Sequence, residues 1–413
     1  MQSLSELTKD YSAARARRLQ LDMSRGKPGA DQLMLSRGLL DARWVEQPKS
    51  ENGLDCRSYG GPEGIPEARR LFGEMLDVPT AQVIVCGNSS LTVMYDYLAQ
   101  CMFLGTGTEE RSAGWGFQPR RGKVKFLCPV PGYDRHFAIL EQLGIEMIAI
   151  PMRAQGPDMA LVEQYARDPD VKGLICVPKY SNPEGKTYSD ETVRAFANLR
   201  PAARDFRVIW DNAYCVHDLD DQGDVLHNIF EEAKAVGTED YFVEVTSFSK
   251  ISFPGAGISC VAASPANIAA MQKRMAAQTI SHDKLNQLRH ARYFGDAAGV
   301  RAHMRRHAEI LRPKFGVVLE LFARDLTGLA QWTVPKGGYF ISLDLPGGCA
   351  KRTAQLCKEA GVVLTSAGAT FPGGIDPEDK NLRVAPTFPP LEELRAATEL
   401  LTLCARIAIA EKT

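Results

Sequence analysis

Residues 207–214 read Arg-Val-Ile-Trp-Asp-Asn-Ala-Tyr, so an apolar run passes directly into a carboxylate and an amide. A short apolar run that ends in a turn is typical of a strand buried on both faces of a parallel sheet. In open α/β sheets, ligands bind in the crevice at the carboxyl ends of such strands. The stretch therefore predicts an α/β fold and makes Asp211 a candidate site residue.

Similar short apolar runs recur between residues 80 and 265, with helix-like stretches between them. This alternation predicts a three-layer αβα domain around a mainly parallel, mixed sheet of seven strands. The strands are expected at Val83–Cys86, Val124–Cys128, Ile145–Ile150, Gly173–Val177, Arg207–Trp210, Phe242–Thr246 and Gly257–Ala262.

The last part of the chain has a different pattern. Apolar residues at helical spacing predict a long amphipathic helix over 298–323, followed by a smaller α/β unit. We expect the N-terminal residues to pack with that unit. The predicted domains are 53–297 for the large one, and 1–52 together with 298–413 for the small one, which includes the long connecting helix. The small unit's elements are expected at Tyr339–Leu343, Val362–Thr365, Leu382–Ala385 and Leu391–Ala408, the last one helical.

The chain has 413 residues, of which 45% are hydrophobic and 24% charged, and its formal net charge is −1. A nearly neutral chain offers no overall field for nucleic acid or an anionic membrane. We find no apolar run long enough to span a bilayer, and the opening residues lack the apolar region of a secretory signal. None of the ten cysteines forms a Cys-x-x-Cys pair, so we expect reduced, buried thiols and a cytoplasmic protein.

A second segment, Ser247-Phe248-Ser249-Lys250, follows an expected strand. Its lysine lies 39 residues after Asp211 and 68 residues after Asn182. Taken alone, Lys250 fits a surface lysine and Asp211 fits the cap of a turn. Together they supply what pyridoxal phosphate needs from a protein, an amine for its aldehyde and a carboxylate for its pyridine nitrogen. We therefore predict that Lys250 and Asp211 are catalytic residues of a pyridoxal phosphate enzyme.

The phosphate of this cofactor needs hydrogen-bond donors and a positive potential. Asn88, Ser89 and Ser90 stand between an expected strand and an expected helix, so backbone N–H groups at the helix start can bind an anion. Ser247 and Ser249 can add hydroxyl donors. These five residues are the predicted phosphate cradle, although a serine at such a position also commonly caps a helix.

Four further side chains suit the ring and the substrate. Tyr133 can stack on the pyridine ring, and Tyr214 and Asn182 can hydrogen-bond the ring hydroxyl from either side. Arg383, in Asn-Leu-Arg-Val-Ala-Pro, can clamp the carboxylate of an amino acid, because a guanidinium pairs with a carboxylate through two parallel hydrogen bonds. A loop tyrosine and a surface arginine are the simpler alternatives.

In the order and spacing of these motifs, from Tyr59-Gly-Gly-Pro-Glu-Gly to Arg383-Val-Ala-Pro, the chain resembles the fold type I, class I aminotransferases, which use pyridoxal phosphate. It is most similar to the divergent bacterial aspartate aminotransferases grouped with MocR-like sequences. The resemblance implies that Lys250 is both the Schiff-base lysine and the proton shuttle. It also implies the ring, phosphate and carboxylate roles described above, with Tyr214 counted among the catalytic residues.

Other assignments rest on the resemblance alone. Tyr59 matches a tyrosine that reaches the cofactor phosphate of the neighbouring subunit, so a homodimer is expected. Gly26, with Lys27 beside it, matches a mobile N-terminal segment that closes over substrate. The chain departs from the family at Ile258, where most members have an arginine that pairs with the phosphate. Ser252, a lysine elsewhere or helix dipoles must then replace it.

A dicarboxylate substrate needs a second basic group, and several candidates lie near the site motifs. The sequence does not choose among them. They are Arg25, Lys27, Arg135, Lys179 and Lys336.

Two histidine patterns have competing interpretations. His303 and His307 stand one helical turn apart, but the glutamate of a His-Glu-x-x-His zinc site is absent. We therefore predict an exposed basic helix face there and no metal site. His217, shortly after Tyr214, is either a supporting residue of the site or an ordinary loop histidine.

The predicted reaction is a ping-pong transamination, in which L-aspartate and 2-oxoglutarate give oxaloacetate and L-glutamate through a Schiff base of Lys250. One alternative is another pyridoxal phosphate enzyme on this scaffold, such as an aromatic or alanine aminotransferase or a β-eliminating lyase. Another is a cofactor-binding regulatory module like those fused to DNA-binding domains. That module needs a winged-helix segment, and we do not expect one in the 58 residues before Tyr59, whose basic content is modest. The expected partners are an amino acid, a 2-oxo acid and a second subunit, with no nucleic acid or membrane.

Overall fold

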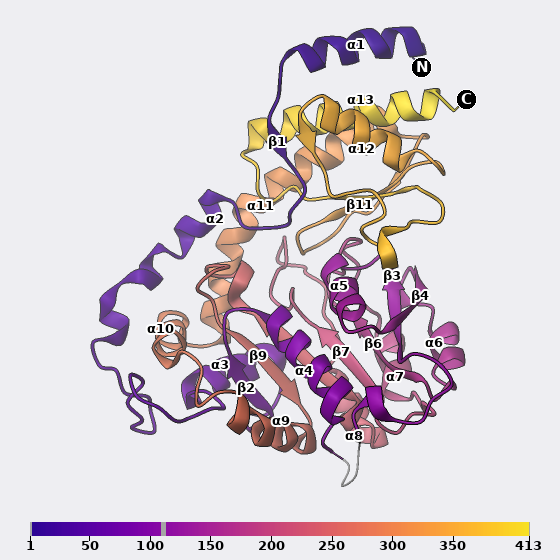
Figure 1. Cartoon of the computed structure of the whole chain (residues 1–413). Helices are drawn as coiled ribbons and strands as arrows, with labels where there is room; N and C mark the ends of the chain where they lie inside the picture. The colour runs from indigo at the N-terminus through magenta and orange to yellow at the C-terminus, as the bar shows by residue number, and fades with distance from the viewer. Residues whose placement is uncertain (1, 109–112, 413) are drawn as a thin grey trace.

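The structure, a computed structural model, describes residues 2–108 and 113–412 (Figure 1). Its centre is an eight-stranded sheet in the order β2-β9-β8-β7-β6-β3-β4-β5. All seven predicted strands lie in this sheet, and the eighth, β5, was not predicted because it has two residues. The strands are β2 (Val83–Cys86), β3 (Lys125–Val130), β4 (Glu146–Arg153), β5 (Gly156–Pro157), β6 (Val171–Cys176), β7 (Arg207–Asp211), β8 (Phe242–Ser247) and β9 (Ser259–Ala263).

The sheet is mixed, as predicted. Strands β4, β3, β6, β7 and β8 run parallel to their neighbours in this series. Strand β9 is antiparallel to both β2 and β8, and β5 is antiparallel to β4. Because β7 and β8 are parallel, their carboxyl ends meet at one edge of the sheet, which brings Asp211 and Ser247 to the same side.

Side chains alternate along the strands between two separate cores. On β7, Val208 and Trp210 belong to one core and Ile209 to the other. The first core is shared with α3, α7, α8 and α10, and the second with α4, α5 and α9, so the three predicted layers are present. These helices are α3 (Pro66–Leu76), α4 (Ser90–Leu104), α5 (Asp134–Gln142), α7 (Asp190–Ala197), α8 (Ile229–Val236), α9 (Pro265–Gln278) and α10 (Lys284–Phe294), with the short α6 (Met159–Tyr165) between β5 and β6.

The predicted long helix is confirmed as α11 (Ala297–Leu326), which continues through Pro313. Its first turns add Val300 and Met304 to the core of the sheet, and its later turns join a third core. The prediction of an exposed face at His303 and His307 is wrong, since their exposed fractions are 6% and 1%. Both lie on the buried side with Met304, whereas the arginines between them face solvent.

Both ends of the chain meet in the third core. Tyr11 of α1 donates a hydrogen bond to the carbonyl of Leu356 on α12 at 2.9 Å, and β1 pairs with β12 in parallel. Figure 1 shows α1 beside α13 at one end of the molecule. The exact domain limits given above stay a prediction. The elements are α1 (Leu4–Ala16), β1 (Leu21–Asp22), α2 (Ala30–Leu35), β10 (Gln331–Trp332), β11 (Ile341–Asp344), α12 (Ala350–Glu359), β12 (Val362–Val363), β13 (Asn381–Val384) and α13 (Leu391–Ala410).

Among the described residues, every helix is too short or too polar to cross a membrane.

Candidate active site

A cleft of about 640 Å³ opens at the carboxyl ends of β7 and β8, between the sheet and the small unit. Its walls come from segments far apart in the sequence, which explains why the motifs are dispersed. Most of the predicted site residues line it. They are Gly26, Lys27, Ser89, Ser90, Tyr133, Asn182, Asp211, Tyr214, Ser247, Ser249, Lys250 and Arg383.

Asp211 ends strand β7 and is 2% exposed. Its Oδ2 lies 2.9 Å from Nε2 of His136, a histidine on α5 that is itself buried. Its Oδ1 is also buried, and within the described part of the chain it has no hydrogen-bond partner. A buried carboxylate oxygen without a donor is costly, so this atom calls for a donor from a bound molecule.

The sequence interpretation missed His136. A histidine on a helix carries no motif of its own. A recognisable signal was its place one turn after Tyr133, at the carboxyl end of the next-but-one strand from β7 in the sheet.

Lys250 closes the short helical turn Phe248–Lys250 directly after β8. Its side chain is half-buried, and its Nζ lies 5.0 Å from the centre of the Tyr214 ring. Burial lowers the pKa of this amine, and the nearby Asp211 carboxylate partly opposes the change. A lowered pKa increases the neutral fraction of the amine, which is the form that reacts with a carbonyl group.

The aromatic side chains of the cleft are also partly or fully buried. Tyr133 lies edge-on to His136 with 4.9 Å between ring centres, and burial raises its pKa to about 12. Tyr214 is 2% exposed, and burial raises its pKa well above the usual range. Both hydroxyls therefore stay protonated near neutral pH and can donate hydrogen bonds.

His217 packs against the rings of Tyr214 and Tyr339, at 5.4 and 5.6 Å between centres. It is buried, and neither of its ring nitrogens has a hydrogen-bond partner among the described residues. Of the two alternatives, the supporting residue of the site agrees better with this position.

The predicted phosphate cradle is brought together only in part. Ser89 and Ser90 stand at the start of α4, and the hydroxyl of Ser247 donates to that of Ser249 at 3.0 Å. Ser249 in turn donates to the carbonyl of Asn88 at 2.9 Å. The Asn88 side chain is exposed and donates to the carbonyl of Pro254, so of the five predicted residues only the four serines line the cleft.

The position of the missing arginine, Ile258, is buried in the core of the sheet. Ser252 was one proposed substitute, but its hydroxyl lies 2.9 Å from Nε2 of His290 and does not line the cleft. Of the other substitutes considered for this arginine, Lys27 lines the cleft and can offer a positive charge to the phosphate. The N-terminus of α4 offers the positive end of the helix dipole.

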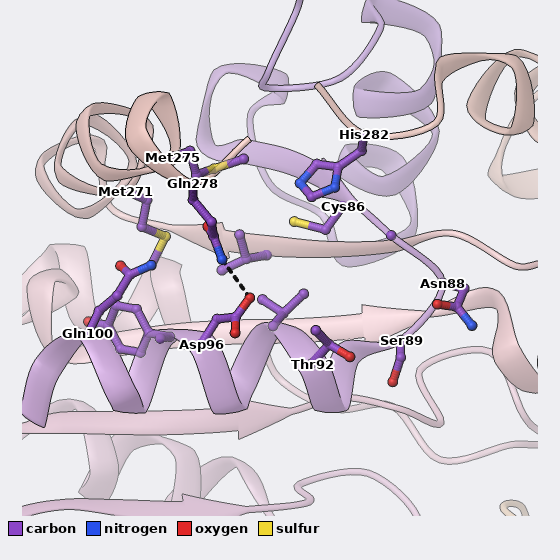
Figure 2. A pocket seen from close by; sticks show the side chains of 14 residues that line it. Cys86, Asn88, Ser89, Thr92, Asp96, Gln100, Met271, Met275, Gln278 and His282 are labelled. Carbon is purple, nitrogen blue, oxygen red and sulfur yellow. Dashed lines mark hydrogen bonds between the residues drawn. The ribbon is translucent and has the colours of Figure 1, made fainter. Parts of the chain in front are cut away.

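Next to Ser89, a hollow of about 180 Å³ lies between α4 and α9. Figure 2 shows Asn88 and Ser89 at the start of α4, with Thr92 and Asp96 following along the helix. Gln278 of α9 closes the far side and donates to Asp96 at 2.8 Å. Ser89 borders both this hollow and the main cleft.

Arg383 lies on β13 and is 7% exposed. Its Nη1 donates to Asp134 at 2.6 Å and to Asn182 at 3.2 Å, and its guanidinium lies 4.9 Å from the centre of the Phe340 ring. The sequence interpretation missed Asp134, since an acidic residue at a helix start is usually only a favourable dipole contact.

The five candidates for a distal carboxylate are reduced to three. Arg25, Lys27 and Arg135 line the cleft. Lys179 and Lys336 lie outside it and pair with other carboxylates, Asp218 at 3.0 Å and Asp224 at 3.4 Å. Lys27 is the lysine considered above for the phosphate, and its Nζ lies 3.8 Å from the centre of the Phe388 ring, so Arg25 and Arg135 are the better candidates for the distal carboxylate.

Glu244 on β8 lies beside Asn212, the residue that follows Asp211, and accepts a hydrogen bond from the Asn212 amide at 2.8 Å. Burial raises the pKa of this carboxyl to about 7, against a smaller lowering by that hydrogen bond. The folded chain thus binds the proton more tightly than the unfolded chain does. The free energy of unfolding must therefore fall as the pH rises from about 4.5 to about 7.

Replacing Glu244 with glutamine keeps the hydrogen-bond acceptor and removes the ionisation. We expect the free energy of unfolding of this variant, relative to that of the parent, to increase by about 3 kcal/mol as the pH rises from about 5 to about 8. Urea unfolding across this range measures the gain, with Glu141→Gln on the exposed side of α5 as the control. A difference between variant and parent that stays constant with pH would contradict the expectation.

The layered fold and the residues that line its cleft are those of an aminotransferase. The crystal structure of an aspartate transaminase from Corynebacterium glutamicum superimposes with a TM-score of 0.96 at 43% identity, covering 99% of this chain and 96% of that one. The model of the aspartate amino-transferase family matches residues 1–413, and the chain belongs to this family.

Two further comparisons agree. The aspartate aminotransferase of Corynebacterium glutamicum is 43% identical over 408 residues, which cover 98% of this chain and 93% of that protein. An α-aminoadipate aminotransferase from Thermus thermophilus, solved with N-(5'-phosphopyridoxyl)-L-leucine, superimposes with a TM-score of 0.76 at 20% identity, over 96% of this chain and 95% of that one. At this identity the second comparison shows the shared fold alone.

Proposed function

We propose that this aminotransferase holds pyridoxal phosphate in the cleft and transfers the amino group of L-aspartate to 2-oxoglutarate. The observation that carries the cofactor is the buried Oδ1 of Asp211, which lacks a donor within the described chain and borders the same cleft as Lys250. A protonated pyridine nitrogen is the donor that this oxygen needs. The choice of aspartate is supported by the name of the Corynebacterium relative.

When bound, pyridoxal phosphate supplies an aldehyde that reacts with amines and a ring that draws electrons from the substrate's Cα. Asp211 keeps the ring nitrogen protonated, and His136 holds the other carboxylate oxygen so that the free one stays aimed at the cleft. Tyr133 covers the ring, and Tyr214 and Asn182 donate to its hydroxyl. Ser89, Ser90, Ser247 and Ser249 hold the phosphate at the start of α4.

Arg383 binds the α-carboxylate of the amino acid and thereby fixes the direction of its Cα–H bond. The neutral amine of Lys250 would take the proton from Cα and deliver it to the former aldehyde carbon of the cofactor, the carbon that receives the amino group. Gly26 and Lys27 border the cleft from the N-terminal segment and screen the bound substrate from water. One set of residues serves both the amino acid and the oxo acid, so we expect ping-pong kinetics.

The active form is proposed to be a homodimer. Tyr59 is 77% exposed and lies outside the cleft of its own chain, as a side chain that reaches a second subunit must. The hollow beside Ser89 offers a second chain access to the phosphate end. The molar mass in solution, measured by light scattering, tests this proposal. The cytoplasm stays the expected location.

The first experiment adds L-aspartate, without an oxo acid, to purified protein loaded with pyridoxal phosphate. We expect the visible absorbance of the bound cofactor to fall as one equivalent of oxaloacetate per site appears. Release of ammonia instead would identify an eliminating lyase. An unchanged band with aspartate but a loss of the band with L-alanine or L-phenylalanine would reject aspartate as the donor.

Arg25 and Arg135 are the basic residues of the cleft that remain for the distal carboxylate of aspartate. We expect the double replacement by methionine to raise the KM for L-aspartate by about 100-fold, as expected for the loss of a charged hydrogen-bonded pair, and to leave the KM for L-alanine within about two-fold. Steady-state kinetics of both donors measure the difference. Lys336→Met, outside the cleft, is the control, and an unchanged KM for aspartate in the double variant would reject the assignment.

A further inference from the structure

Gln32 of α2 is the centre of a buried network of hydrogen bonds, called the bridge below. This bridge connects the N-terminal segment to the helical turn Phe248–Lys250. The exposed fraction of Gln32 is 0%. Its Oε1 accepts the main-chain N–H of Gly29 at 3.1 Å. A main-chain N–H can only donate, so the amide atom that faces Gly29 must be the oxygen. The amide nitrogen of Gln32 therefore faces the other way, and its two hydrogens can be donated to the partners described next.

The first of these partners is Tyr339, whose Oη lies 2.9 Å from the amide nitrogen of Gln32. The same Oη lies 3.2 Å from the main-chain carbonyl oxygen of Lys250. A carbonyl oxygen only accepts, so the tyrosine hydroxyl accepts from Gln32 and donates to Lys250. The bonds therefore run in one direction, from Gly29 through Gln32 and Tyr339 to Lys250.

The second partner is His307, whose Nδ1 lies 3.0 Å from the amide nitrogen of Gln32. Burial lowers the pKa of His307 to about 3 and that of His303 to about 4, so both rings are neutral. His307 therefore accepts from Gln32 at Nδ1, and its Nε2 lies 3.1 Å from Nε2 of His303. Nε2 of His303 also lies 3.0 Å from the carbonyl oxygen of Ile251, next to the lysine, and the hydroxyl of Ser36 lies 3.3 Å from the same oxygen.

Helix α2 is itself held firmly in place. Lys314 of α11, which is 3% exposed, pairs with Asp31 at 3.0 Å and donates to the carbonyl of Thr387 at 3.0 Å. Thr387 in turn donates from its hydroxyl to the carbonyl of Lys27 at 3.0 Å. The segment 24–27, which borders the cleft, is thus fixed to the same frame as Gln32.

We propose that Gln32 and Tyr339 are positioning residues that set the main chain of Lys250 and tie it to the substrate-facing segment 24–29. The inference rests on the proposed role of Lys250. Four methylene groups separate the Lys250 amine from its Cα, so a shift of the main chain is passed on to the reacting nitrogen. A misplacement of about 1 Å is enough to cost up to about 100-fold in rate. The bridge touches neither the substrate nor the amine itself.

The test begins with protein freed of cofactor and follows the visible band that forms when pyridoxal phosphate is added. Tyr339→Phe removes one oxygen atom and with it the contact to Lys250. We expect the band to form about ten-fold more slowly, and kcat of the loaded enzyme to fall about ten-fold while KM stays within about two-fold. Tyr11→Phe is the matched control, because the Tyr11 hydroxyl also donates to a main-chain carbonyl, that of Leu356.

Gln32→Leu removes the preceding link, and the two substitutions combined test whether both act on the same bond. In a bridge that acts in series, the double variant is no slower than the more impaired single variant. Thermal unfolding of each variant shows whether it is folded. If Gln32→Leu is unfolded, the result for Tyr339→Phe alone tests the inference.

Three results would overturn the inference: band formation in Tyr339→Phe at the parent rate, an equal slowing in Tyr11→Phe, or fully additive effects in the double variant. A parent protein that forms no band would instead reject the proposed role of Lys250, and this inference with it.

Discussion

Replacement of Lys250 by alanine lowers the rate of transamination by more than about 10⁴-fold, the upper range for loss of a group that both attacks a carbonyl and transfers a proton. The half-buried amine lies 5.0 Å from the centre of the Tyr214 ring in the cleft, and its lowered pKa provides the neutral form. Coupled assay of oxaloacetate with aspartate and 2-oxoglutarate measures the loss. Gel filtration should also remove the cofactor from the variant and leave it on the parent.

Lys273→Ala, on the exposed surface of α9, is the control for this experiment and should retain the parent rate. Thermal unfolding checks that Lys250→Ala is folded. Turnover by a folded Lys250→Ala variant within ten-fold of the parent would end the proposed mechanism.

Asp211→Asn is expected to lower kcat/KM by about 10³-fold, the size of a strong electrostatic contribution in a buried site. The amide keeps the shape of the side chain but cannot hold a positively charged ring nitrogen, so the ring draws fewer electrons from Cα. Steady-state kinetics measure this loss, and fluorescence titration of the cofactor-free variant should show weaker binding of pyridoxal phosphate.

A buried aspartate that does not line the cleft provides the control for Asp211. Asp376 is 4% exposed and accepts the main-chain N–H groups of Lys380 and Asn381, each at 2.8 Å. Asp376→Asn should lower stability without changing kcat/KM in the folded fraction. If Asp211→Asn behaved in the same way, the orphaned oxygen would have no role in the reaction.

The sheet could be predicted from the sequence because most of its strands, with β4 as the exception, are buried along their length and therefore form largely apolar runs. The cleft residues could be predicted where they follow such a run directly, as Asp211 and Lys250 do. Strand β5 could not, since two residues carry no periodicity. Asp134 and His136 were missed because their function depends on contacts with Arg383 and Asp211, which only the tertiary structure reveals.

The interpretation of His303 and His307 failed for a reason that the sequence already contained. On α11 they share a face with Met304, Ala308 and Leu311, all of which are buried. Helical spacing alone places them on that face. The arginines between them point the other way, so the charge of the segment was a poor guide to the surroundings of the histidines.

The pairing of Arg383 with Asp134 has a consequence for the end of each catalytic cycle. A buried guanidinium left without an anion is strongly destabilising. If Arg383 binds the substrate carboxylate as proposed, its guanidinium can pair with Asp134 again when the product leaves, so release does not leave an isolated buried charge. In this proposed role, Arg383 can bind a carboxylate firmly during the reaction. The product can still leave without the cost of an unpaired buried guanidinium.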